Sequence, residues 1–272
     1  MDMSGFAPGF PEPFTPRGVA AFARASLNRV LSAQLIIAVL AAASVAWLLY
    51  DGCFPVIGTA IQQLPADGEI RSGKLDWQGA SPQLLAEGRI LALDVDLSHS
   101  GQITSTADWQ IEFGTNSVRV LSLPGYVDFP YAPDRDAPFN RTDLEPLWGA
   151  WKAEILFLAG VGTALALLAC WWLLATVYFV PVWLLGFFAN RGLNLRSSWK
   201  LSAAALMPGA LLMAAGIVMY DFGLLRSWVS LGFLFASHFV LGWIYLFLSL
   251  LFLPRISGIP QPGNPFGQKR EA

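Results

Sequence analysis

The run from Ile155 to Ala189 lies within the longest stretch of the chain without a charged side chain and covers 35 residues. A helix needs about 20 apolar residues to cross a hydrocarbon layer about 30 Å thick, so this run can span a bilayer. Only 13% of all residues are charged, whereas about a quarter are charged in a typical soluble domain. The sequence therefore predicts an integral, mainly α-helical membrane protein.

Three further apolar stretches are long enough to cross a bilayer, which brings the predicted number of membrane-spanning helices to four. Residues 31–50 form the first span and end in Trp47 and Tyr50, which suit the membrane interface. Residues 201–220 form the third span and residues 228–253 the fourth. Because the connection between these two is short, we expect them to be antiparallel neighbours.

Two prolines are expected to disturb the predicted spans. Pro181 lies inside the second predicted helix, residues 153–190, and the residue before a proline avoids the α conformation. We therefore expect residues 153–179 to cross the membrane and residues 181–190 to continue along the interface. Pro208, with the glycine that follows it, predicts a kink in the third span.

Basic residues are unevenly distributed, and cytoplasmic loops of membrane proteins carry an excess of Lys and Arg. Segment 51–152 holds seven basic and fourteen acidic residues. The arm 1–30, the loop 191–200 and the tail 254–272 hold nine basic residues: Arg17, Arg24, Arg29, Arg191, Arg196, Lys200, Arg255, Lys269 and Arg270. We expect a multi-pass protein of the cell's inner (plasma) membrane, with both termini cytoplasmic and residues 51–152 outside.

The N-terminal region allows alternative interpretations. Ser44, Val45 and Ala46 resemble a signal-peptide cleavage site, but the arm of about 30 residues is longer than a signal peptide allows, so we expect an uncleaved anchor. Residues 17–30 follow a Pro-rich start and alternate basic and apolar side chains. They form either an amphipathic helix on the inner leaflet or an extension of the first span.

Segment 51–152 has the alternation of a β-rich domain. Residues Arg89–Ser98 place Leu91, Leu93, Val95 and Leu97 on one face of a strand, with Asp94 and Asp96 on the other, which we expect to be solvated. Further strands are predicted over Glu69–Trp77, Asp108–Phe113 and Ser117–Leu123. The proline-rich stretch 130–146 is expected to be an irregular loop that returns to the membrane.

Few residues have a pattern that indicates chemistry. His99 lacks a neighbouring ligand at zinc-site spacing, and the aspartates lack a calcium-loop pattern, so no metal, cofactor or catalytic residue is predicted. His238 lies in the middle of the fourth span. An ionisable group at that depth is a functional candidate, although a neutral histidine bonded to a neighbouring helix is the alternative.

Several segments together resemble the DUF1189 family of bacterial integral membrane proteins. They are Phe14–Arg17, Gly68–Ile70, Pro82, Leu93–Asp96 and Leu195–Pro208. The resemblance implies the same topology, with a domain between the first two spans, in a bacterial inner membrane. It implies no reaction.

Aromatic and arginine side chains accompany the prolines after the last predicted strand: Phe129, Tyr131, Arg135, Phe139 and Arg141. Exposed aromatic residues beside arginines are typical of protein interfaces. The same rings could instead rest on the bilayer surface, so both interpretations stay open.

These patterns predict a non-enzymatic membrane component. We expect an accessory subunit or sensor whose extracytoplasmic domain binds a partner or ligand. The expected partners are the lipid bilayer and another membrane protein or a second copy of the chain. Nucleic acid is not expected, because no basic patch with interleaved aromatic residues is present. A small transporter or channel component built from the four spans is the alternative.

Overall fold

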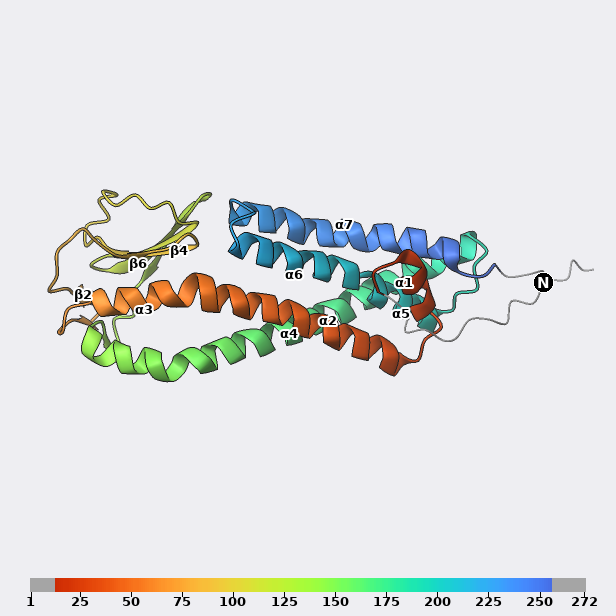
Figure 1. Cartoon of the computed structure of the whole chain (residues 1–272), viewed down its shortest axis with the longest axis horizontal. Helices are drawn as coiled ribbons and strands as arrows, with labels where there is room; N and C mark the ends of the chain where they lie inside the picture. Colours follow the sequence, from red (N-terminus) through yellow and green to blue (C-terminus); the bar gives the residue numbers. More distant parts are fainter. Residues whose placement is uncertain (1–12, 256–272) are drawn as a thin grey trace, which may run out of the picture. The chain divides into compact units, whose positions relative to one another are not determined.

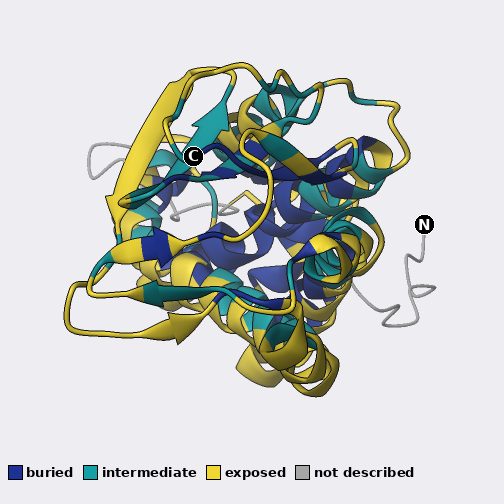
Figure 2. Cartoon of the chain, turned by 90° about the vertical axis from the view of Figure 1, so that its left-hand side faces the viewer, coloured by how far each residue is buried: buried dark blue, intermediate teal, exposed yellow. Residues whose placement is uncertain are grey.

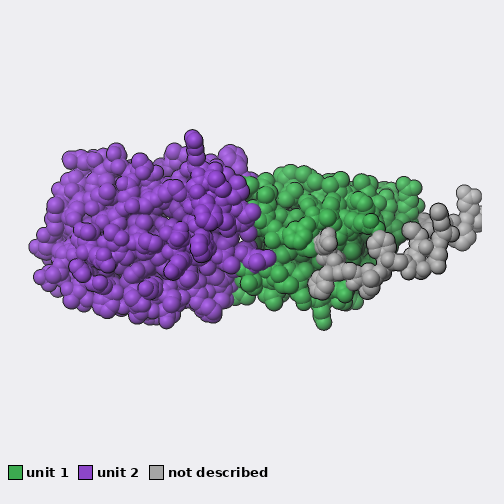
Figure 3. All heavy atoms as spheres, in the orientation of Figure 1, with its two compact units in different colours: residues 1–39, 164–213, 234–272 green, residues 40–163, 214–233 purple. Residues whose placement is uncertain are grey.

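The computed structural model describes residues 13–255. The Pro-rich start of the arm and the tail with Lys269 and Arg270 lie outside the described residues. The chain divides into two compact units, shown in different colours in Figure 3. The bundle unit comprises residues 1–39, 164–213 and 234–272, and the sheet unit comprises residues 40–163 and 214–233.

Helices and strands follow one another in an order that matches the predicted architecture (Figure 1). The helices are α1 (Pro16–Phe22), α2 (Leu27–Leu48), α3 (Phe54–Gln63), α4 (Arg141–Phe188), α5 (Leu195–Ala205), α6 (Met207–Asp221) and α7 (Trp228–Phe252), with a π-helical turn, η1 (Leu49–Cys53), between α2 and α3. Within residues 13–255, four helical stretches are long and apolar enough to cross a membrane: Leu27–Gln63, Arg141–Phe188, Leu195–Asp221 and Trp228–Phe252. A small β-sheet region separates the first two, which confirms the predicted order of elements.

The first two long helices extend further than the apolar runs from which they were predicted. Helix α3 continues the first helix to Gln63, and α4 begins at Arg141 rather than near residue 153. The side-chain oxygen of Asn140 accepts a hydrogen bond from the backbone N–H of Asp143 over 2.9 Å, which caps the start of α4. Hydropathy marks where a helix leaves an apolar layer but not where its backbone hydrogen bonds end.

The two prolines have different effects. Helix α4 is uninterrupted at Pro181 and ends at Phe188, so of the kink or break predicted near Val180 the break is absent. A proline removes one backbone hydrogen bond, and the bonds around it keep this long helix continuous. In the third stretch, helices α5 and α6 are separated at Leu206, two residues before Pro208, as the sequence predicted for this region.

Two sheets form between α3 and α4. The strands are β1 (Glu69–Arg71), β2 (Lys74–Asp76), β3 (Gln83–Glu87), β4 (Leu91–Val95), β5 (Trp109–Phe113), β6 (Ser117–Ser122), β7 (Gly125–Pro130) and β8 (Ala137–Pro138). The small sheet has the order β2-β1-β8 and the large one β3-β4-β5-β6-β7. All neighbouring strands of the two sheets are antiparallel except β4 and β5, which are parallel.

The large sheet packs one face against helix α3. Leu91, Leu93 and Val95 of β4 join Ala60 and Leu64 in a buried apolar cluster. The sequence predicted the strand alternation that builds this face, but β3, β7 and helix α3 were missed. The predicted strand over Glu69–Trp77 is a hairpin of two short strands that turns at Ser72 and Gly73, both of which have positive φ.

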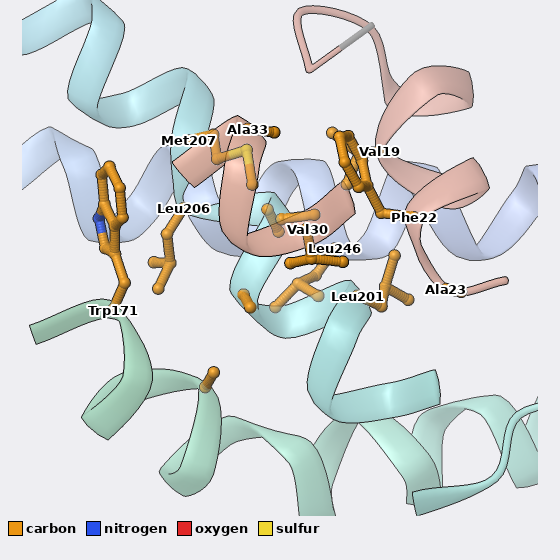
Figure 4. Close-up of a cluster of buried hydrophobic side chains, with 14 of the residues drawn as sticks. Val19, Phe22, Ala23, Val30, Ala33, Trp171, Leu201, Leu206, Met207 and Leu246 are labelled. Carbon is orange, nitrogen blue, oxygen red and sulfur yellow. The ribbon is translucent and has the colours of Figure 1, made fainter. Parts of the chain in front are cut away.

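The bundle unit has its own core, part of which is shown in Figure 4. Val19 and Phe22 of α1 are fully buried in it, together with Leu201 of α5 and Leu246 of α7. Ser249 of α7 donates a hydrogen bond to the carbonyl of Pro16 over 2.9 Å. Helix α1 is therefore a separate short helix packed into the unit. Residues 27–30 extend the first predicted span as the start of α2, so the extension describes only the end of the arm.

Candidate functional site

Asp94 and Asp96, predicted on a solvated strand face, are both fully buried, so that prediction is wrong. Parallel strands need a crossover connection, and residues 96–108 make it without a helix. The side-chain amide of Gln110 contacts the carbonyl of Ile103 in this connection over 3.5 Å, so the loop lies across the polar face. The crossover connection therefore buries the two aspartates. The alternation of side chains along a single strand does not reveal such a connection.

Asp96 fixes the turn at the start of this connection. Its carboxylate accepts hydrogen bonds from the backbone N–H of Ser98, Ser100 and Gly101 at 3.2, 2.6 and 3.2 Å. Burial alone would raise the pKa of Asp96, but the hydrogen bonds from Ser100 and Ser98 outweigh it and the pKa lies below its ordinary value. Its role is structural.

Asp94 lies in a less complete polar environment. Gln110 donates to its Oδ2 over 2.7 Å, and its Oδ1 has no hydrogen-bond partner among the described residues. Burial raises the pKa of Asp94 to about 7, with smaller contributions from the nearby carboxylates of Glu112 and Asp96. This carboxyl group therefore changes its charge near neutral pH.

His99 belongs to the same polar face. Its Nδ1 pairs with Glu112, its Nε2 lies 3.2 Å from the Ser117 hydroxyl, and Arg119 lies 3.9 Å from the same glutamate. Within residues 13–255, no three His, Cys, Asp or Glu side chains gather closely enough to hold a metal ion. These residues form a partly buried polar layer of the sheet.

Strand β7 is the clearest open surface of the sheet unit. It is exposed along its whole length and forms one edge of the large sheet (Figure 2). Its Val127 and Phe129 stand opposite Val120 and Val118 of β6 and continue the apolar face of the sheet. The side chains there border a groove of about 330 Å³, lined by Trp109, Val120, Ser122, Pro124, Gly125, Tyr126, Val127 and Phe129.

The five residues predicted to bind a partner occupy different environments. Phe129 is 55% exposed in the β7 groove, and Arg135 and Arg141 are exposed outside it. Phe139 is only 7% exposed and packs against Phe113 in the core, so its predicted surface exposure is wrong. Tyr131 is half-buried and donates a hydrogen bond to the carbonyl of Gly114 over 3.1 Å.

Tyr126 and Val127 of the groove were not predicted to lie on a strand. The residues at or next to the ends of that strand, Pro124, Gly125 and Pro130, are typical of turns and loops. A signal was present: residues 126–129 alternate after a Leu-Pro-Gly turn. Since prolines are tolerated on edge strands, this alternation between turn residues indicates an edge strand rather than a loop.

A second feature, the Arg89 cluster, consists of Trp47, Arg89, Asp108, Tyr220 and Asp221 and joins the strands to the ends of helices α2 and α6. The Arg89 guanidinium lies 4.6 Å from the centroid of the Tyr220 ring and donates hydrogen bonds to the carbonyls of Tyr220 and Asp221. Trp47 donates to the Asp221 carboxylate over 2.7 Å. No sequence pattern links these five positions, which are up to 174 residues apart.

His238 is buried in the bundle unit beside Gly209 of α6. A Cβ atom added at Gly209 would lie 2.5 Å from His238 Nδ1, so the glycine makes room for the imidazole. Gln34 is a further buried polar residue that connects helices in this unit. It donates to the carbonyl of Ala203 over 3.3 Å and accepts from Trp172 over 3.2 Å.

Comparisons with known proteins found no match: no family model, no curated protein and no solved structure resembles the chain detectably. The resemblance to the DUF1189 family stays a prediction.

Proposed function

We propose that the protein is a non-enzymatic component of a bacterial inner membrane, an accessory subunit or sensor that binds an extended segment of a partner protein along strand β7. In this proposal both termini are cytoplasmic and the strands lie outside the membrane. The observation that carries it is the open edge of β7, which combines unpaired backbone groups with an apolar groove.

The register of the β6–β7 hairpin identifies the groups available to a partner. Ser122 and Gly125 face each other across a two-residue turn, and Tyr131 donates its backbone N–H to Asn116 over 3.1 Å. Because hydrogen-bonded positions alternate in an antiparallel pair, Tyr126 and Asp128 direct their N–H and C=O groups away from β6. An added strand would pair with these two residues.

The side chains of the edge suit such a partner. Val127 and Phe129 offer apolar contact to alternate side chains of an added strand. The Asp128 carboxylate accepts hydrogen bonds from Arg119 at 2.8 and 3.2 Å, so a partner does not meet an unneutralised charge. Exposed edges attract strands, and Pro130, which has no N–H group, limits the paired length.

The distribution of charge supports the orientation. The described residues of the bundle unit contain seven basic residues and no acidic one, whereas the sheet unit contains eight basic and sixteen acidic residues. Cytoplasmic segments of membrane proteins are enriched in Lys and Arg. The basic ends of the bundle unit therefore favour the cytoplasmic side.

The Arg89 cluster supports a role beyond passive binding. It connects the residues that precede β4 and β5 to the ends of two candidate spans. A partner that shifts the sheet would also displace these contacts. A sensor could in this way transmit binding at the sheet to its helices. A route of this kind needs two discrete arrangements to act as a switch.

Backbone-selective variants test the binding mode. In cells, a photoreactive residue in place of Val127 should form a discrete crosslink to another protein. Asp128→Pro removes an outward N–H group and should abolish the crosslink, whereas Asp128→Asn retains that group and should preserve it. A crosslink that survives Asp128→Pro, or that joins only lipid or a second copy, contradicts the proposal.

Cysteine labelling tests the orientation separately. In a Cys53→Ser/Cys170→Ser background, Asp76→Cys should react with an impermeant thiol reagent in intact cells and Ser197→Cys should be protected. The opposite pattern would reverse the proposed topology.

A further inference from the structure

The π-helical turn η1 lies where the apolar run of the first helix stops. Tyr50 is the last residue of that run and Asp51 follows it. A π turn inserts an extra residue into a helix and often marks a functional site. Here Tyr50 and Asp51 line a groove of about 500 Å³ in the sheet unit, together with Phe54, Pro55, Trp148, Lys152, Ala153 and Leu156.

The groove has an apolar floor formed by two helices. The Phe54 and Trp148 rings meet edge to face, with their centroids 4.9 Å apart. A Cβ atom added at Gly58 would lie 3.7 Å from Trp148 Nε1, which is van der Waals distance, so the Trp148 ring of α4 lies against α3. The floor of the groove is therefore a contact between the two helices.

Two opposite charges line this apolar groove. Asp51 comes from η1 and Lys152 from α4, and both are exposed. Across residues 13–255, neither makes an ion pair within 4.0 Å. A groove that presents an anion and a cation, neither of them held in an ion pair within 4.0 Å, is complementary to a ligand that carries both charges.

The level of the groove along the helices indicates the source of such a ligand. Lys152 precedes the charge-free run that begins at Ile155, just as Asp51 follows the run that ends at Tyr50. Both charges therefore lie where apolar helix surface gives way to polar surface, which is the headgroup level of a bilayer. Trp151, which is 56% exposed, is a further aromatic residue at this level.

We propose that this groove binds the headgroup of a zwitterionic bilayer lipid of the phosphatidylethanolamine class. Lys152 contacts the lipid phosphate, Asp51 contacts the ammonium group, and an acyl chain follows α4 past Leu156. The inference rests on the four helices crossing a bilayer. It does not depend on strand addition at β7.

Native mass spectrometry of the full chain, with equal amounts of phosphatidylethanolamine and phosphatidylglycerol added in detergent, tests this proposal. Wild type should retain phosphatidylethanolamine in preference. Lys152→Gln should lower the retention of both lipids about tenfold, since it removes a charge-assisted contact to phosphate. Asp51→Asn should remove the preference, because phosphatidylglycerol has a phosphate but no ammonium group.

Glu154→Gln is the matched control, because Glu154 is an exposed carboxylate close to Lys152 that does not line the groove. This variant should bind both lipids like wild type. Equal retention of the two lipids by wild type, or an unchanged preference in Asp51→Asn, overturns the assignment. Matching thermal melts of all the variants exclude misfolding as the cause, and the β7 crosslink should be unaffected by any of them.

Discussion

The hydroxyl of Tyr220, at the end of α6, donates a hydrogen bond to Oδ2 of Asp108, directly before β5, over 2.6 Å. Tyr220 is 2% exposed and Asp108 is half-buried, so this bond is partly shielded from solvent. It connects a candidate span to the parallel pair at the centre of the large sheet. The predictions below begin with this contact.

Tyr220→Phe should lower the free energy of unfolding by about 1 kcal/mol, because it leaves Asp108 without the hydroxyl donor. Asp108→Asn should also destabilise the protein. The double variant should cost less than the two single effects combined, since both remove the same bond. Thermal unfolding in one detergent measures the cycle, and strictly additive effects would argue that the two residues do not interact.

Arg89→Lys should loosen the junction although the positive charge is retained. Lysine cannot provide the planar guanidinium that lies over the Tyr220 ring while donating to two backbone carbonyls. Hydrogen exchange should become faster in β4 and β5. Arg71→Lys is the control, because the Arg71 side chain is 66% exposed and, among the described residues, forms an ion pair with Glu69 alone. Equal exchange in both variants would contradict the prediction.

Between about pH 4 and pH 7 the ionisation of Asp94 should make the sheet unit less stable as the pH rises. The pKa of Asp94 is about 7 in the folded protein, against 3.8 for an ordinary aspartate, so the native state binds more protons than the unfolded state in this window. Asp94→Asn should flatten that slope and stabilise the protein at pH 8. Unfolding midpoints across the pH range measure the slope. A wild-type stability that rises over this window would show that Asp94 is not the dominant group.

Phe139→Ala and Phe129→Ala should have opposite consequences. Phe139 is buried against Trp77 and Phe113, and its loss should cost about 3–5 kcal/mol of stability. Phe129 is exposed, so its truncation should change stability by no more than about 0.5 kcal/mol while weakening the β7 crosslink. Melting curves and crosslink yield separate the two effects. A stable Phe139→Ala variant that has lost the crosslink would show that Phe139 belongs to the binding surface.

The order of the elements could be predicted from sequence because the properties involved are local. An apolar run of sufficient length identifies a candidate span wherever it occurs, and the fourth span was predicted to within one residue of α7. The alternation of Leu91, Leu93 and Val95 identified β4 in the same way. The excess of acidic over basic residues in segment 51–152 is likewise a property of the sequence alone.

Burial of polar and aromatic side chains was decided by contacts between distant segments. Asp94 alternates like a solvated residue, yet a crossover connection covers it. Phe139 lies among prolines and charges like a surface residue, yet it fills the core beside Trp77 and Phe113. The Arg89 cluster joins three parts of the chain with no shared pattern. Period and composition describe neighbours along the chain, whereas the free energy of burial depends on which surfaces meet after folding.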